Sequence, residues 1–307
     1  MGAAAPAFAA PTAEEIENAS FDGAPLPEGQ SALTAKVQIL LDRAGISPGV
    51  IDGYKGGMSE TAIRAFEERQ GLEVDGLLDE QVWVGIGGDM AQEVTGTYTI
   101  TAEDTEISGT LPDDFGEMAE LDWLGYERVS ERIAERFHMD EDFLIALNPD
   151  AAFAEGDELT VVQPGERLSA EVARITVSGA DRRLRAYGAD GAMIASYPVA
   201  VGSTQTPSPS GTHSVEAVAM EPTYSYRPDV NFQQGDNTEP LTIPPGPNGP
   251  VGLVWIDLSE PTYGIHGTPR PARLFVENSN GCVRMTNWDA EELAHMVSTG
   301  IEVEFLQ

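Results

Sequence analysis

Ser279-Asn280-Gly281-Cys282-Val283-Arg284-Met285 contains the only cysteine of this 307-residue chain. Tyr263-Gly264-Ile265-His266-Gly267-Thr268 comes shortly before it. A cysteine becomes a nucleophile when a base takes its proton and a nearby positive group lowers its pKa, and His266 and Arg284 are residues of those two kinds. The alternative is a buried structural cysteine, which would more often lie among Val, Leu and Ile. The pattern favours a thiol nucleophile at Cys282.

The charge of the chain excludes several classes of partner. The sequence has 17 Lys+Arg against 51 Asp+Glu, a formal charge of −34, which argues against nucleic acid and anionic membrane surfaces as partners. From residue 171 onward there are 16 acids and 8 bases, net −8, so the first 170 residues carry 51 − 16 = 35 acids and 17 − 8 = 9 bases, net −26. The acidity therefore belongs to the N-terminal half, where it fits either a saline environment or simple solubility.

The sequence predicts no metal site, no nucleotide cofactor and no membrane span. No His/Cys/Asp cluster has metal-ligand spacing, and no Gly-rich phosphate loop follows a strand, so neither a metal nor a nucleotide cofactor is expected. No stretch has about 18 consecutive apolar residues, so no membrane span is expected.

The first 30 residues are rich in Pro, Ala and Glu and are predicted to be a leader without regular structure. Ala3–Pro11 is small and apolar, and Ala7-Phe8-Ala9 has the Ala-x-Ala form of a signal-peptidase site. This stretch resembles the end of a secretory signal and predicts export to the periplasm or cell wall. The alternative is a flexible Ala/Pro leader.

Residues 31–90 have the pattern of a small three-helix domain. Apolar residues recur at helical spacing from Ser31 to about Gly45, from Ser59 to Gln70, and in a short helix at Glu80–Val84. Ser59 is a candidate N-cap, and the glycine that follows Gln70 is a candidate helix stop.

Within this region, Val37–Trp83 resembles the small peptidoglycan-binding domain. The resemblance rests on two Asp-Gly turns, on a central helix and on a tryptophan: Asp52-Gly53, Thr61-Ala62-Ile63-Arg64-Ala65-Phe66, Gly71-Leu72-Glu73-Val74-Asp75-Gly76 and Trp83. It implies binding of cell-wall glycan or peptide. The alternative is a spacer domain that has lost its ligand.

Residues 95–165 resemble a LysM module. Ile133–Phe137, Leu144–Pro149 and Gly156–Val162 match its second half, and Tyr98-Thr99-Ile100 is a candidate opening strand. The segment from Glu103 to Asp122 has eight acids and no Lys or Arg, a composition that favours a solvated linker or an irregular insertion. It would lie inside the module. Because of this departure from the family pattern, we expect a structural rather than a sugar-binding role.

Residues 172–307 are predicted to be a mainly-β domain. Arg174–Val177 alternates between polar and apolar residues, and further short strands are expected at Ala192–Val201 and Val251–Leu258. A helix is expected at Trp288–Ser298 with Asn287 as its cap. The long intervening loop, residues 220–250, is rich in Pro, Gly and Asn, a composition typical of functional or disordered loops.

This region resembles the L,D-transpeptidase catalytic domain of the YkuD type. The motifs occur in the family's order: Pro198-Val199-Ala200-Val201-Gly202, Thr206-Pro207, Pro209-Ser210-Gly211, Tyr263–Thr268, Ser279–Met285 and Asn287-Trp288-Asp289. The whole chain is therefore expected to be a multidomain α+β protein, with a small three-helix N-terminal domain, a LysM-like α/β module and a mainly-β L,D-transpeptidase catalytic domain.

The resemblance implies a mechanism and its residues. His266 would take the proton of Cys282, and the carbonyl of Gly267 would orient His266. Backbone N–H groups around Gly281 and Cys282 would form an oxyanion hole, which Ser279 would support. Arg284 would hold a substrate carboxylate or the site itself; the alternative is a structural ion pair with Asp289 or Glu291.

Asn280 departs from the family pattern, which has a histidine at this position in Ser-His-Gly-Cys. Asn donates a hydrogen bond but carries no proton near neutral pH. If the family histidine serves as a hydrogen-bond donor to the oxyanion, Asn280 can replace it. If the histidine shuttles a proton, Asn280 would make the enzyme slower or direct it to a different acceptor.

The resemblance implies peptidoglycan stem peptides as partners: a tetrapeptide donor and an amine acceptor, joined into a 3–3 cross-link. Water as acceptor would make the protein a carboxypeptidase or endopeptidase, and a protein amine would make it an attachment enzyme. A non-catalytic wall-binding protein is the second hypothesis, because of Asn280. Candidate substrate-binding residues are the aromatic and basic side chains of the loop and its flanking strands: Tyr224, Tyr226, Arg227, Trp255 and Tyr263.

Overall fold

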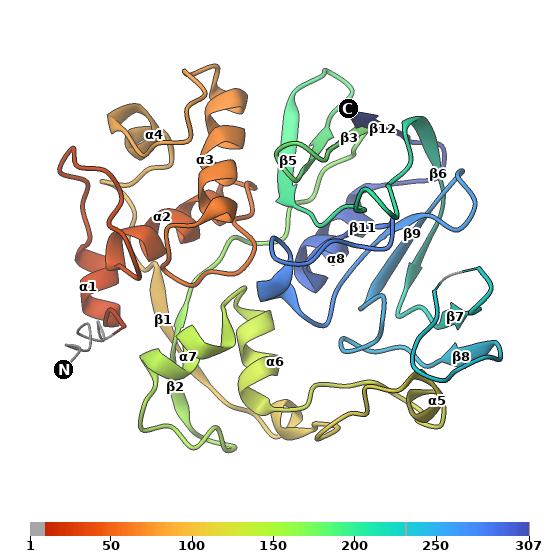
Figure 1. Cartoon of the computed structure of the whole chain (residues 1–307). Coiled ribbons are helices and arrows are strands. Elements are labelled where there is room, and N and C mark those ends of the chain that lie inside the picture. Colours follow the sequence, from red (N-terminus) through yellow and green to blue (C-terminus); the bar gives the residue numbers. More distant parts are fainter. Residues whose placement is uncertain (1–9, 231, 307) are drawn as a thin grey trace, which may run out of the picture.

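The computed structural model describes residues 10–230 and 232–306 and has two bodies joined along a broad contact (Figure 1). The N-terminal body extends to β2 (Glu158–Val162), and the C-terminal body begins at β3 (Arg174–Ser178). The signal-like motif Ala7-Phe8-Ala9 lies outside the described residues.

The N-terminal body begins earlier than the sequence predicts. Residues 13–18 form helix α1 (Ala13–Asn18), although the segment before residue 31 was expected to have no regular structure. Thr12 and Glu15 form a capping box at its start, and Ile16 is fully buried in the core. The prediction of disorder is therefore wrong for this segment, because composition does not reveal one well-capped turn with a single buried anchor.

The three predicted helices of the next region are confirmed as α2 (Ala32–Arg43), α3 (Gly57–Gln70) and α4 (Glu80–Gly85). Helix α3 ends at Gly71, whose φ of 66° is left-handed. Its N-cap is Gly56 rather than Ser59, which lies inside the helix and accepts a hydrogen bond from Gln38 Nε2 at 3.0 Å.

The following segment pairs β1 (Thr95–Thr99) with β2 in antiparallel fashion, and α6 (Val129–Arg136) and α7 (Glu141–Leu147) lie between them in sequence. One hydrophobic cluster runs from Ile16 through the three helices to Val162. The two regions predicted as separate domains therefore share a single core.

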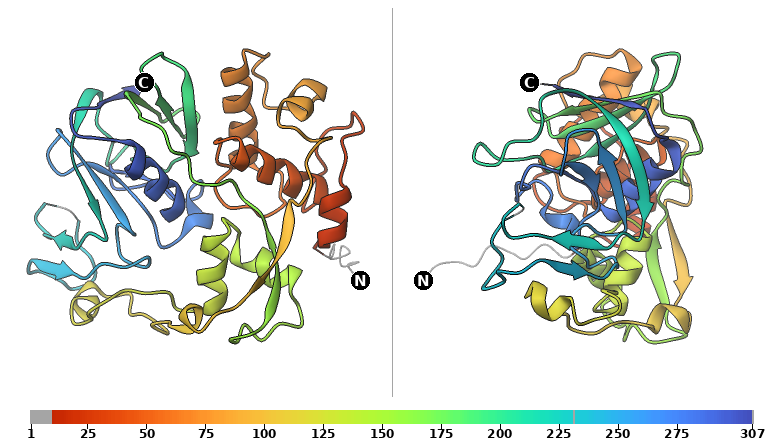
Figure 2. Two further views of the ribbon diagram at one scale, coloured as in Figure 1. Left: turned by 180° about the vertical axis from the view of Figure 1, so that it is seen from behind. Right: turned by 90° about the vertical axis from the view of Figure 1, so that its right-hand side faces the viewer.

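The acidic segment between β1 and α6 leaves this core. It contains the 3₁₀ turn η1 (Glu103–Thr105) and the one-turn helix α5 (Phe115–Met118), which lies beside the hairpin β7 (Tyr224–Tyr226) and β8 (Leu241–Ile243) of the other body (Figures 1 and 2). A small cluster around buried Leu124, Tyr226 and Ile243 joins the two segments. The segment is thus a structured bridge rather than a solvated linker.

The C-terminal body is built on an eight-stranded sheet in the order β11-β10-β9-β6-β12-β3-β4-β5. Its remaining strands are β4 (Arg183–Tyr187), β5 (Met193–Pro198), β6 (Gly211–Met220), β9 (Val254–Leu258), β10 (Gly264–His266), β11 (Val283–Arg284) and β12 (Glu302–Leu306). Two pairs are parallel, β3 with β12 and β10 with β11. The mainly-β prediction is confirmed, within a mixed α+β chain.

Helix α8 (Asn287–Met296) follows β11 and packs its buried side chains into the sheet's core. Its cap is Thr286, whose side chain accepts from Asp289 N, so the predicted cap Asn287 is the first residue of the helix instead. Among the helices in the described part of the chain, none has the length and hydropathy that a membrane crossing requires.

Candidate active site

Two short parallel strands bring the candidate nucleophile and base together. In the β10–β11 pair, Ile265 lies opposite Val283, and His266 lies opposite Arg284. Cys282, one residue before β11, therefore lies opposite Gly264, and because alternate residues share a face, its side chain leaves the pair on the same face as His266 and Arg284. The sixteen residues between β10 and β11 return the chain in the same direction, which a parallel pair requires.

The turn before Cys282 needs a glycine. Gly281 has a φ of 117°, and a Cβ there would lie 2.7 Å from a ring carbon of Tyr263. The hydroxyl of buried Ser279 donates to the carbonyl oxygen of Cys282 and accepts from Gly281 N at 3.1 Å. Ser208 Oγ donates to Gly281 O at 2.7 Å. These bonds fix the backbone on both sides of the thiol.

His266 is buried and has one defined tautomer. Its Nδ1 lies 2.7 Å from the carbonyl oxygen of Gly267, and because a carbonyl only accepts, Nδ1 carries the proton. Nε2 is then left with a lone pair. The ring stacks on Trp255, with centroids 5.7 Å apart. Burial, together with the charge of Arg284, lowers the pKa of His266 to about 4, so the ring is neutral at physiological pH.

The thiol of Cys282 is in its protonated state. Its Sγ lies 3.8 Å from the carbonyl oxygen of Thr262, a residue with a left-handed φ of 73°. Burial raises the pKa of Cys282, although the N–H of Gly264 and the charge of Arg284 oppose this effect. The two pKa shifts therefore favour a neutral thiol and a neutral imidazole and not an ion pair.

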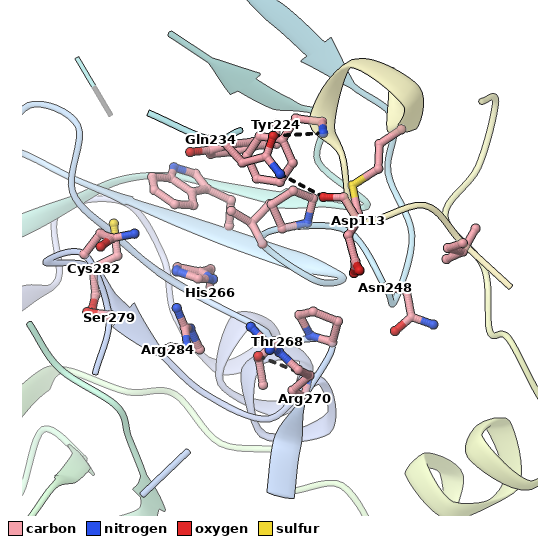
Figure 3. Close-up of a pocket in the computed structure, with 18 of the residues that line it drawn as sticks. Asp113, Tyr224, Gln234, Asn248, His266, Thr268, Arg270, Ser279, Cys282 and Arg284 are labelled. Atoms are coloured by element: carbon pink, nitrogen blue, oxygen red, sulfur yellow. Dashed lines mark hydrogen bonds between the residues drawn. The ribbon is translucent and has the colours of Figure 1, made fainter. Parts of the chain in front are cut away.

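A cavity of about 690 Å³ opens over both residues (Figure 3). Its wall comes from three parts of the chain: the acidic bridge, the start of α6 and the C-terminal body. The lining residues include Leu111, Asp113, Phe115, Met118, Glu127, Arg128, Glu131, Tyr224, Phe232, Gln234, Asn248, Trp255, Thr262, Tyr263, His266, Arg270, Ser279, Asn280, Cys282 and Arg284.

Three of the predicted substrate-binding residues, Tyr224, Trp255 and Tyr263, line this cavity. Tyr226 is fully buried beneath the hairpin, where its hydroxyl accepts from Gln234 N at 3.0 Å. The structure therefore places Tyr226 in the small core and not at the cavity, although it lies on the same face of β7 as Tyr224, two residues earlier. Arg227 is exposed and does not line the cavity.

Arg284 and the predicted oxyanion donors also differ in part from expectation. Arg284 pairs with Glu277, Nη1 to Oε2 3.8 Å, and not with Asp289 or Glu291. The Gly281 N–H is already bonded to Ser279 Oγ, so it is not free in the resting loop. The N–H of Cys282 is left as the candidate oxyanion donor.

One support of the site was not predicted. Asn287 Nδ2 donates to both carboxyl oxygens of Glu135 on α6, at 3.3 and 3.0 Å, and to Pro247 O at 3.1 Å. Its Oδ1 packs against Gly267 so closely that a Cβ there would lie 2.2 Å away. Burial raises the pKa of Glu135 to about 8, which keeps it mostly protonated at neutral pH. The sequence carries no signal of this contact, because Glu135 lies in a helix rich in charged residues and its partner is 152 positions away.

Comparison with known proteins gives two family matches. Residues 172–304 match the YkuD L,D-transpeptidase catalytic domain, and residues 30–84 match a putative peptidoglycan binding domain. The chain is 33% identical over 178 residues to the putative L,D-transpeptidase YkuD of Bacillus licheniformis, over 56% of this chain and 90% of that protein.

Similarity to other relatives is shorter. The probable L,D-transpeptidase ErfK/SrfK of Escherichia coli is 28% identical over 156 residues, 49% of each chain, and the YkuD relative of Bacillus subtilis is 34% identical over 111 residues, 36% of this chain and 52% of that protein. The chain thus spans about half the length of these two relatives. A solved L,D-transpeptidase from Mycobacterium smegmatis aligns over 50% of this chain and 64% of its own, with 19% identity and a TM-score of 0.37.

Proposed function

The chain belongs to the L,D-transpeptidase family, and on that premise we propose that it is a cysteine acyltransferase that forms 3–3 cross-links in peptidoglycan. The observation that carries the proposal is that the thiol of Cys282 and His266, whose protonated Nδ1 leaves a lone pair on Nε2, line the same cavity.

In the first half-reaction, Cys282 Sγ attacks the amide carbonyl between the L-centre of a diamino acid and the terminal D-residue of a tetrapeptide stem. The thiol proton passes to His266 Nε2, and the negative charge on the carbonyl oxygen is met by the Cys282 N–H. The C–N bond then breaks, His266 returns its proton to the leaving amine, and the stem remains on sulfur as a thioester.

In the second half-reaction, an amine of a neighbouring stem attacks the thioester. His266 takes the proton of that amine, the C–S bond breaks, and the proton ends on sulfur as the thiol is restored. Water in place of the amine would give hydrolysis, and an amine of a protein would give attachment of that protein to the wall.

The supporting residues divide into two groups. Ser279 and Gly281 fix the backbone of the nucleophile, and the carbonyl of Gly267 holds the tautomer of His266. Arg284 adds a positive charge that favours the thiolate as it develops, and Asn280 donates from the exposed side of the turn. Tyr224, Trp255 and Tyr263 contact the stem.

The N-terminal body would keep the enzyme at its substrate. Residues 31–90 would bind peptidoglycan, and residues 95–165 would be a LysM-like module with a structural role, for which the order β1–α6–α7–β2 is suggestive. A protein with these partners works outside the cytoplasm, in the periplasm or cell wall.

The test is incubation with a disaccharide-tetrapeptide followed by mass spectrometry. A dimer that has lost one D-residue is expected, and Cys282→Ala should abolish it while leaving the protein folded. A carbapenem should add its mass at Cys282. If the intact protein gives neither product nor adduct, the non-catalytic wall-binding function, which Asn280 favours, replaces the enzyme.

A further inference from the structure

The cavity extends well beyond the thiol, and its far half is built by the acidic bridge. Asp113 and Asn248 lie at the opposite end of the pocket from Cys282, with His266 between them (Figure 3). We propose that this far half, walled by residues 111–118, is the subsite for the acceptor stem, and that it selects an amine over water. The inference rests on the proposed transpeptidase function.

The wall is held in place by the long loop of the C-terminal body. The side-chain amide of Gln234 accepts a hydrogen bond from Phe115 N at 3.1 Å and donates one to Asp113 O at 2.8 Å. One side chain therefore bonds to the backbone of the bridge on both sides of Asp114. Asn237 Nδ2 donates to Asp114 Oδ2 at 2.9 Å. Three hydrogen bonds from two side chains thus fix a short segment that has no regular structure apart from the single turn of α5.

Aromatic packing makes the wall rigid. The ring of Phe115 lies edge-on to Tyr226 at 5.2 Å and to Tyr224 at 6.0 Å between centroids. Behind them, Leu124 N donates to Pro245 O at 2.9 Å, and Leu124 is fully buried. The bridge and the hairpin β7–β8 therefore form one unit beside the pocket.

The two ends of the pocket carry opposite charge. Arg284 follows the thiol by two residues, and Arg270 lies beside Thr268, on the side of Asn248 (Figure 3). The far end has three carboxylates, Asp113, Glu127 and Glu131, against Arg128 and Arg270. Arg128 is already paired with Glu127 at 2.9 Å, with Glu131 at 3.5 Å and with Glu141, outside the pocket, at 2.8 Å. The far end is therefore net acidic and suits a ligand that brings an ammonium group.

The chemistry assigns this half to the acceptor rather than to the leaving group. Both must reach His266 Nε2, because both exchange a proton with it. The leaving group is a single D-residue, and a wall that runs from Leu111 to Met118 and on to Asn248 is longer than one residue needs. A stem peptide with an amine at its side chain fits both the length and the charge.

The experiment separates acylation from transfer. Gln234→Ala removes both bonds to the bridge, and Asp113→Asn removes one charge without a side-chain hydrogen bond being lost in the structure. The matched control is Glu117→Gln, an exposed carboxylate on α5 that does not line the pocket. Each variant is given disaccharide-tetrapeptide, and the dimer, the hydrolysed tripeptide and the carbapenem adduct are measured.

We expect the ratio of dimer to tripeptide to fall about tenfold in Gln234→Ala and about threefold in Asp113→Asn. The rate of carbapenem acylation should stay within about twofold in all three variants, since acylation needs no acceptor. An unchanged ratio, or a ratio that falls equally in Glu117→Gln, would overturn the subsite. An intact protein that only hydrolyses would overturn it too, whereas one with no product and no adduct would overturn the proposed function itself.

Discussion

Two contacts between the bodies are made by the first turn of α8, and they differ in which groups of the C-terminal body they support. Asn287 bonds to Glu135 of α6, and two residues later Asp289 Oδ2 accepts from Ser47 Oγ at 2.9 Å. Behind Asn287 is Gly267, whose carbonyl holds His266. Behind Asp289 lies a polar cluster that does not line the active-site cavity: Asp42, His138, Tyr197 and Glu292.

The difference indicates that one contact between the bodies supports catalysis, whereas the other supports only the stability of the fold. The Glu135 contact reaches the base through two successive groups, the amide of Asn287 and the backbone of Gly267. The Asp289 contact joins α8 to Ser47, in the loop between α2 and α3. Buried Arg183 of β4 strengthens it by donating to Ser47 O at 2.8 Å. One contact should therefore affect turnover, and the other should affect unfolding.

The largest expected effect follows from removing Glu135. In Glu135→Ala, Asn287 loses its carboxyl acceptor and keeps only the bond to Pro247 O, so Gly267 is held less firmly and the orientation of His266 relaxes. Because small misplacements of catalytic groups are costly, kcat for D-residue release should fall about tenfold to a hundredfold with little change in KM. Steady-state kinetics on the tetrapeptide measures both.

Glu135→Gln is the matched control for this prediction. With a pKa of about 8, Glu135 is mostly protonated at pH 7, and Gln has nearly the same shape and still offers an acceptor to Asn287. Its kcat should stay close to that of the intact protein at pH 7. Equal losses in Ala and Gln variants would show that Glu135 does not position His266.

The Asp289 contact should appear in the pH dependence of stability. Burial raises the pKa of Asp289 from 3.8 to about 7. Folding therefore favours the protonated carboxyl, and the stability it contributes is complete below about pH 4 and is lost as the pH rises through 7. Burial opposes the charge on His138, but the Asp42 carboxylate raises its pKa overall, so its contribution is also lost as the pH rises.

Between pH 5 and pH 8, Asp289 alone should cost roughly 2–3 kcal/mol of unfolding free energy. Urea titrations at the two pH values measure it, and Asp289→Asn should reduce the loss by that amount while kcat at pH 7 stays unchanged. Glu135 and His138, whose pKa values are also raised, account for the part that remains, and a loss that is unchanged in Asp289→Asn would contradict the prediction.

His266 in the active-site cavity and His138 in the polar cluster near Asp289 differ in the direction of their pKa shifts. His266 has a lowered pKa of about 4, and His138 has a raised one. The rate of Cys282 alkylation by iodoacetamide should rise about tenfold per pH unit from pH 6 to 8, since the thiol pKa is raised and neutral His266 adds no inflection. His138→Gln should leave this profile unchanged. A plateau near pH 6.5 would indicate a preformed thiolate–imidazolium pair instead.

Much of the local structure could be predicted from the sequence. The helices α2, α3 and α4 have strong apolar spacing and clear stops, and the Cys282 and His266 motifs lie on neighbouring strands as short ordered patterns suggest. The position of Gly267 after the histidine led directly to the observed carbonyl contact. These features depend on residues close together in the chain.

The rest depends on contacts between distant residues, which periodicity does not record. Glu135 lies 152 positions from Asn287, and Gln234 lies 119 positions from Phe115. Tyr224 and Tyr226 lie on the same face of β7, but Tyr226 is fully buried in the cluster with Leu124 whereas Tyr224 reaches the cavity, and this depends on packing between the two bodies. The acidic bridge looked like a linker because its few apolar residues are buried by another body and not by each other.

The smallest expected effect concerns Asn280, a residue of the C-terminal body. Its side chain is exposed at the mouth of the cavity, whereas Cys282 is half-buried and His266 is buried. If Asn280 acts only as a hydrogen-bond donor, Asn280→His should change the rate of D-residue release by no more than about threefold at pH 7, less than one typical hydrogen bond. A larger gain that follows a new titration near pH 6.5 would mean that a second proton carrier was missing, and His266 alone would then not suffice as the base.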